Sequence, residues 1–152
     1  MKIINLSNIP RLSSELRIIP FKYCETSGVN FFPEGVQAGF PSPARDFEDQ
    51  KLSLDSRYLS KPNSTFIIQV VGHSMYPTLH ENDLLIVRSD LSLEDKKIGI
   101  VSVNYTDFTV KRFDKQAQKL LADNPNFDDI RIEDEDVLYC LGVVETLFRD
   151  LK

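Results

Sequence analysis

The pattern of apolar and polar positions changes near residue 65. From there to the C-terminus, short runs rich in β-branched and aromatic residues alternate with turn residues. We expect six strands, at Thr65–Val71, Leu84–Arg88, Ile98–Asn104, Phe108–Phe113, Lys119–Ala122 and Val137–Phe148. The last is long enough to bend at Gly142. Short strands at this spacing predict a mainly β domain, built as a curled antiparallel sheet or a sandwich.

The N-terminal part has a different texture. Residues 1–38 contain Pro10, Pro20, Gly28, Pro33 and Gly35, and prolines exclude a long helix. We expect an extended arm over 1–38. We expect an extended linker over 39–64, because it begins with two prolines at alternating positions, Pro41 and Pro43, which favour extended backbone. Its stretch 46–59 fits either a helix or an irregular connection. The β-rich domain then covers residues 65–152.

Length and charge limit the function. A chain of 152 residues fits one domain with its own core. The net charge is −5, yet the arm holds four basic and three acidic residues, so the rest of the chain is strongly acidic. Because phosphate neutralisation supplies most DNA affinity, an acidic body argues against direct sequence-specific DNA binding. The proline-rich arm also cannot form a three-helix DNA-reading domain.

Other patterns argue against a membrane or a metal. No run approaches the roughly 18 apolar residues of a spanning helix, and no apolar leader follows a basic start, so we expect a cytoplasmic protein. Cys24 and Cys140 are expected to be free thiols, with Cys140 buried. Residues 128–136 hold six carboxylates but lack the glycine and terminal glutamate of a calcium loop. We predict a solvated acidic surface there, with no metal and no cofactor.

The stretch from Val71 to Leu79 reads V-G-H-S-M-Y-P-T-L. A predicted strand ends at Gly72, and Ser74 stands where the chain must turn before Pro77. A loop at a strand end can present a hydroxyl to a substrate. Without a partner, an ordinary turn serine would explain Ser74 equally well.

A partner lies 37 positions later, in the strand that carries Lys111. Alternation places Lys111 on one face with Thr109 and Phe113. A lysine acts as a general base only when neutral, and at pH 7 only about one in a few thousand is neutral. Burial among apolar groups lowers a lysine pKa. An apolar strand can therefore make Lys111 a base for Ser74. Arg112, on the opposite face, is expected to extend to solvent.

A histidine base is the main rival hypothesis. His73 neighbours Ser74 directly, and adjacent side chains of extended backbone diverge. His80 lies beyond a proline turn, and no carboxylate is marked out to complete a triad. A cysteine nucleophile at Cys24 or Cys140 is less favoured still.

Several motifs together resemble the LexA/UmuD family of self-cleaving peptidases. They are G-H-S-M at 72–75, N-D-L-L-I-V at 82–87, F-T-V-K at 108–111 and G-V-V at 142–144. The stretch G-F-P-S-P-A at 39–44 resembles the start of the processed UmuD product. The resemblance covers residues 39–152 and implies the fold of the LexA C-terminal domain.

The resemblance also implies roles for single residues. Ser74 would be the nucleophile, Lys111 the general base and Ala38–Gly39 the bond that is cut. The backbone N–H groups of His73 and Ser74 would hold the oxyanion. Three features depart from the UmuD pattern. Ala38 replaces the usual cysteine, His73 replaces an acidic residue, and the arm is longer by about a dozen residues, by comparison with the family.

Partners follow from the resemblance as well. Without a DNA-binding domain, the chain resembles the mutagenesis branch of the family. That branch implies a homodimer whose cleavage is stimulated by the RecA filament on single-stranded DNA. The shortened product would act with a UmuC-type Y-family polymerase in translesion synthesis during the SOS response.

Three other interpretations remain open. Residues 74–79 resemble the Ser-Met-x-Pro-Thr-Leu box of signal peptidases, which also use a Ser–Lys dyad but normally carry a membrane anchor. A LexA-like repressor fragment is the second. The third is a binding module without catalysis, which would also describe the processed form.

Overall fold

The computed structural model describes residues 1–6, 8–22, 29–30 and 51–152. They belong to two compact units, one of residues 1–21 with 63–152 and one of residues 22–62. The predicted cleavage site, Ala38–Gly39, lies outside the described residues. In the part of the chain that the structure describes, no helix has the length and apolar character needed to cross a membrane.

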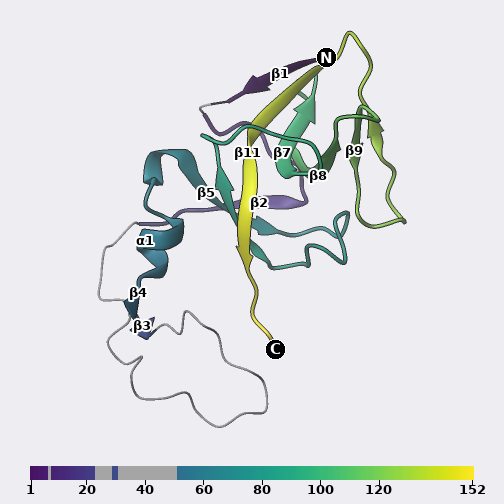
Figure 1. The fold of residues 1–152 in the computed structure, drawn as a ribbon. Coiled ribbons are helices and arrows are strands. Elements are labelled where there is room, and N and C mark those ends of the chain that lie inside the picture. The colour runs from purple at the N-terminus through teal and green to yellow at the C-terminus, as the bar shows by residue number, and fades with distance from the viewer. Residues whose placement is uncertain (7, 23–28, 31–50) are drawn as a thin grey trace. The chain divides into compact units, whose positions relative to one another are not determined.

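The first unit is built on one curled sheet (Figure 1). Its strands are β1 Lys2–Asn5, β2 Leu16–Ile19, β5 Thr65–Val70, β6 Leu84–Arg88, β7 Ile98–Val103, β8 Thr109–Asp114, β9 Lys119–Leu121, β10 Ile130–Arg131 and β11 Val137–Phe148. Their order is β10-β9-β8-β7-β11-β6-β5-β2, and β1 pairs with β11. The mainly β, antiparallel prediction is confirmed, and each of the six expected strands agrees within one residue at either end.

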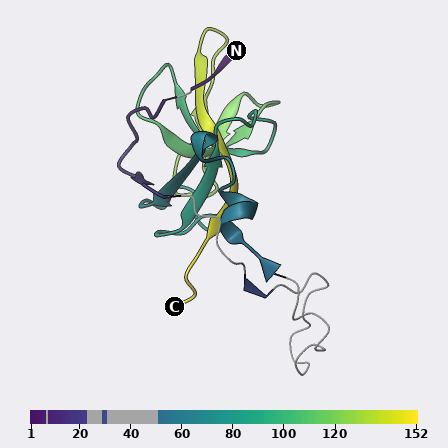
Figure 2. The same cartoon turned by 90° about the vertical axis from the view of Figure 1, so that its left-hand side faces the viewer.

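Strand β11 organises this sheet and is the yellow strand in both ribbon views (Figures 1 and 2). It pairs with β7, with β6 and, in parallel, with β1. The register with β7 shifts between Cys140 and Gly142, which confirms the expected bend. A Cβ at Gly142 would lie 2.8 Å from the Arg88 carbonyl oxygen, so this close approach requires glycine.

Both faces of the sheet are covered by core. One cluster contains Ile100 and Leu141, and the other contains Val101 and Cys140. Neighbours along a strand thus enter opposite clusters, as side-chain alternation requires. Sheets buried on both faces show continuous apolar runs, which explains the apolar texture of β7 and the middle of β11.

The N-terminal segment contributes more to the sheet than an extended arm alone would. β1 lies beside the start of β11, and β2 pairs antiparallel with β5 at the edge of the sheet. Between them, the N–H of Phe108 donates to the carbonyl of Arg11, and the N–H of Ser13 donates to the carbonyl of Phe108. Residues 11–19 therefore cross from the start of β8 to the edge of β5.

The second unit is small. β3 Val29–Asn30 pairs antiparallel with β4 Lys51–Leu52. Helix α1, Leu54–Tyr58, follows and begins at Ser53, whose hydroxyl accepts a hydrogen bond from the N–H of Ser56. A 3₁₀ turn at Pro62–Ser64 precedes β5. Within the described part of 46–59, the open choice is resolved as a short strand over Lys51–Leu52 and a helix over Leu54–Tyr58.

Candidate functional site

Ser74 lies in the compact loop after β5. Its side chain is buried, with 3% of the residue exposed. Met75 and Leu79 are buried on the same loop and insert into the core. The N–H of Leu79 donates to the carbonyl of Met75 at 2.9 Å. These anchors hold the serine in one place.

Strand β8 brings Lys111 to this loop. Lys111 Nζ lies 2.8 Å from Ser74 Oγ and 3.2 Å from the Val110 carbonyl oxygen. Only 5% of Lys111 is exposed. Burial lowers the pKa of the Lys111 ammonium below its ordinary value, while the carboxylates of Glu15 and Asp129 act in the opposite direction. The two residues that the sequence paired are therefore in direct contact.

Glu15 is a member of this site that sequence reasoning missed. Its Oε2 lies 3.1 Å from Ser74 Oγ, 3.0 Å from Thr109 Oγ1 and 3.9 Å from Lys111 Nζ. Glu15 lies on the N-terminal segment, directly before the first residue of β2. No local pattern marks it, because its place depends on the pairing of β2 with β5.

Gly72 leaves room for the Glu15 side chain beside the nucleophile loop. A Cβ at Gly72 would lie 2.6 Å from Glu15 Cγ and Oε1. Gly72 does not adopt the left-handed backbone conformation. The glycine before the nucleophile loop therefore allows close approach of the Glu15 side chain and is not required for a special turn.

Asn124 holds the backbone of the nucleophile loop and was also missed. Its Nδ2 donates to the His73 carbonyl at 2.9 Å, and its N–H donates to the Ser74 carbonyl at 3.0 Å. A peptide unit is planar and trans, so fixing the His73 carbonyl also fixes the direction of the Ser74 N–H. Asn124 thus orients one of the two N–H groups assigned to the oxyanion.

On the other face of β8, Arg112 binds Asp123. Its Nε and Nη2 lie 2.9 and 2.6 Å from the two carboxylate oxygens. The Arg112 hydrogen bond lowers the pKa of Asp123, and the Asp123 hydrogen bond raises the pKa of Arg112. The expectation that Arg112 simply extends to solvent was wrong, because a bidentate pair fixes it beside Asn124.

The rival nucleophiles and bases lie elsewhere. The His73 side chain is 61% exposed, and its Nε2 lies 3.8 Å from Glu81. His80 Nε2 contacts the Pro77 carbonyl at 3.0 Å. Cys140 is buried, and burial raises the pKa of its thiol to about 11, so it is a poor nucleophile. Cys24 falls outside the described residues.

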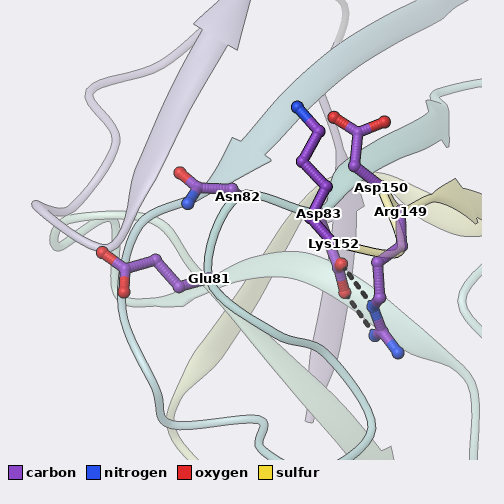
Figure 3. A pocket seen from close by; sticks show the side chains of 6 residues that line it. All are labelled: Glu81, Asn82, Asp83, Arg149, Asp150 and Lys152. Carbon is purple, nitrogen blue, oxygen red and sulfur yellow. Dashed lines mark hydrogen bonds and ion pairs between the residues drawn. The ribbon is translucent and has the colours of Figure 1, made fainter.

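A separate pocket lies where β11 ends (Figure 3). Its lining residues are Glu81, Asn82, Asp83, Arg149, Asp150 and Lys152. Asp83 is fully buried, and Arg149 Nη2 lies 2.6 Å from it. Burial alone would raise the pKa of Asp83, but hydrogen bonds from Arg149 and the His80 N–H outweigh it and lower that pKa. The pair fastens the C-terminal end to the loop after Ser74.

Within the described residues, no group of three or more His, Cys, Asp or Glu is placed to hold a metal ion.

Comparison of the sequence with known proteins identifies relatives of this chain. The model of the Peptidase S24-like family matches residues 30–145. SamA from Salmonella typhimurium is 34% identical over 133 residues, which cover 85% of this chain and 91% of SamA. ImpA from Escherichia coli is 37% identical over 100 residues, covering 63% of this chain and 68% of ImpA.

MucA from Salmonella typhimurium is 35% identical over 85 residues, which cover 55% of this chain and 58% of MucA. The chain therefore spans little more than half the length of that relative. The family match covers most of this chain, and the SamA match covers nearly all of that relative. The chain thus belongs to the Peptidase S24-like family and, within it, to the UmuD-like members of the LexA/UmuD family.

Proposed function

We propose that this protein is a Ser–Lys peptidase that cuts its own chain between Ala38 and Gly39. The observation that carries the proposal is the 2.8 Å contact of Lys111 Nζ with Ser74 Oγ at a buried site. Burial favours the neutral amine, which is the form that can accept a proton. Membership of a peptidase family supports serine peptidase chemistry at the general level.

The reaction runs through an acyl-enzyme. Ser74 Oγ attacks the carbonyl carbon of Ala38, and its proton passes to Lys111 Nζ. The C–N bond to Gly39 then breaks, and the Gly39 nitrogen takes that proton and leaves as a new N-terminus. A water molecule then attacks the ester carbonyl carbon and gives one proton to Lys111, which passes it to Ser74 Oγ as the ester C–O bond breaks. The released Ala38 carboxyl group loses its remaining proton to solvent and becomes a carboxylate.

Backbone N–H groups would stabilise the tetrahedral intermediates. We assign this role to the backbone N–H groups of the nucleophile Ser74 and of the preceding residue, His73. Loss of one such donor typically slows an acyl transfer by about 10²–10³-fold. The hydrogen bond from Asn124 Nδ2 to the His73 carbonyl supports the assignment of the Ser74 N–H, because these two groups belong to one peptide unit.

The biological role that we propose is that of a UmuD-like protein of SOS mutagenesis. Cleavage would be stimulated by the RecA filament on single-stranded DNA. The product, as a homodimer, would act with a UmuC-type Y-family polymerase in translesion synthesis. Similarity to SamA, ImpA and MucA supports this role, and the acidic charge of the chain fits a protein that does not bind DNA itself.

Intact-mass analysis of the purified full chain at pH 10, with and without RecA filament, tests the peptidase proposal. We expect conversion to a product that begins at Gly39 and ends at Lys152. Ser74→Ala and Lys111→Ala should both prevent it, whereas His73→Ala should retain it. A cut at another bond, or loss of cleavage in His73→Ala with cleavage kept in Lys111→Ala, would contradict the proposal.

A further inference from the structure

The N-terminal segment occupies the edge of the sheet beside the nucleophile. Strand β2 pairs with β5 from Leu16↔Val70 to Ile19↔Ile67. At the end nearest Ser74, the carbonyl of Glu15 accepts hydrogen bonds from the N–H groups of Val71 and Gly72, at 2.7 and 3.3 Å. The backbone donors that lead into the nucleophile loop are therefore already used by the protein's own N-terminal segment.

The hydrogen bonds at Ser74 define an inactive arrangement. Lys111 Nζ donates to Ser74 Oγ, and Ser74 Oγ donates to Glu15 Oε2. A serine hydroxyl has one hydrogen. While that hydrogen is directed to Glu15, it is not directed to Lys111, which is the proposed base.

The charge of Glu15 opposes the reaction as well. Two carboxylates influence Lys111, Glu15 from the N-terminal segment and Asp129 from the loop after β9, and both favour its ammonium form. Glu15 is the one at short range, 3.9 Å from Nζ. A carboxylate there also repels the negative charge that develops on Ser74 Oγ and on the oxyanion.

Glu15 further occupies space that a substrate needs. A reacting carbonyl carbon must come within about 3–3.5 Å of the nucleophile. Glu15 Oε2 already lies 3.1 Å from Ser74 Oγ, and Thr109 Oγ1 also donates a hydrogen bond to it at 3.0 Å. Its side chain is only 24% exposed, so neighbouring groups confine it.

We propose that Glu15 is an autoinhibitory residue, which reaches the Ser74–Lys111 pair when strand β2 lies on the edge of β5 and which must withdraw before the chain can cut itself. The proposal rests on the peptidase function proposed above. Self-cleavage is then limited by how often residues 11–19 leave the edge of β5. Any event that lifts this segment accelerates cleavage without changing the dyad.

Three substitutions at Glu15 separate charge from bulk. Glu15→Gln removes the charge and keeps the size, and it should speed spontaneous cleavage at pH 7.5 by about tenfold, because a neutral neighbour leaves more of the base unprotonated. Glu15→Ala also empties the space and should be faster still. Glu15→Asp keeps the charge and should stay closest to the wild-type chain. Glu94→Gln, the same change on an exposed loop, is the matched control and should leave the rate unchanged.

The pH dependence gives a readout that looser packing alone would not move. In Glu15→Gln the rise of rate with pH should shift to lower pH, since burial and Asp129 then remain as the influences on the pKa of Lys111. Circular dichroism and thermal melting check that each variant is folded. A Glu15→Gln chain that cuts at the wild-type rate or slower, with an unshifted profile, overturns the proposal. Slower cleavage would make Glu15 part of the catalytic machinery instead.

A second measurement keeps this inference distinguishable from the peptidase proposal. A fluorophosphonate probe reacts with an activated serine and needs no scissile segment. Faster labelling of Ser74 in Glu15→Gln than in wild type supports the autoinhibitory role even if no cut occurs at Ala38–Gly39. Cleavage of the wild type at that bond, without faster labelling or cutting in Glu15→Gln, leaves the peptidase proposal standing and removes this one.

Discussion

Two adjacent residues of β8, Lys111 and Arg112, carry the same charge and sit in opposite environments. Lys111 is buried against Ser74, and burial lowers its pKa. Arg112, on the other face, makes a bidentate pair with Asp123, whose hydrogen bond raises the arginine's pKa. One strand thus holds a cation prepared to lose its proton beside a cation fixed in its charged form. Only a lysine can take the first position, since arginine stays protonated.

The two faces are also connected. Asp123, which pairs with Arg112, directly precedes Asn124, which holds the backbone on both sides of the nucleophile. The pair on one face therefore supports the geometry of the dyad on the other. Changes at Lys111 should remove the chemistry, and changes at Arg112 should affect it only through Asn124.

The largest expected effect comes from exchanging the cations. Lys111→Arg should reduce self-cleavage by at least about 10²–10⁴-fold, because it keeps the charge but loses the base. Arg112→Lys keeps a cation facing Asp123 and should lower the rate only a few-fold. Intact-mass time courses at pH 10 measure both. Equal losses in the two variants would mean that charge, and not proton transfer, is what β8 contributes.

A smaller loss is expected at Asn124. Asn124→Ala should slow cleavage by roughly 10- to 100-fold, because the His73–Ser74 peptide unit loses its hydrogen bond from Asn124 Nδ2 and a misplaced group costs rates of this order. The pH dependence should stay that of the wild type, since Lys111 is untouched. Asn126→Ala, two residues along the same loop, is the control. A shifted pH profile in Asn124→Ala would contradict a purely positioning role.

The smallest effect concerns stability. A lysine with a depressed folded pKa destabilises the fold at neutral pH, because the unfolded chain binds the proton more tightly. Lys111→Met should therefore raise the free energy of unfolding by about 1 kcal/mol at pH 7, or roughly 2–4 °C in the melting temperature. The destabilisation that Lys111 causes in the wild type should diminish as pH rises from the folded pKa to the unfolded lysine pKa of about 10.4, so the difference between the variant and the wild type should shrink over this range.

Arg112→Met provides the contrasting measurement. It leaves Asp123 without its bidentate partner and should lower the free energy of unfolding by about 2 kcal/mol. Thermal melts of both variants from pH 7 to pH 10 give the comparison. Destabilisation of Lys111→Met at neutral pH would show that Lys111 is bound as a stable ammonium, contrary to the account.

The sequence predicted most of the sheet because its strands are local patterns. Strands β5 to β8 and β11 can be recognised from their own apolar runs, and the bend in β11 from its glycine, Gly142. Ser74 and Lys111 could also be paired, since one follows a strand end and the other lies in an apolar strand. These features depend on neighbours along the chain.

Glu15 and Asn124 could not be predicted in this way. Glu15 reaches Ser74 only because β2 pairs with β5, and residues 16–19 carry no signal for that partner. Asn124 looks like an ordinary turn residue until the loop after β9 folds against the nucleophile loop. The pairing of Arg112 with Asp123 was misjudged for the same reason, because it joins a strand to a loop through tertiary packing.

The pH dependence of self-cleavage shows whether Lys111 is the base, because the rate follows the protonation of the group that accepts the Ser74 proton. Wild-type chain should convert to the product beginning at Gly39 at a rate that rises with pH, with a midpoint below the ordinary lysine value of 10.5, because burial lowers the pKa of Lys111. A rate that levels off near pH 6.5, the range of an ordinary histidine, or that does not change with pH, would contradict Lys111 as the base.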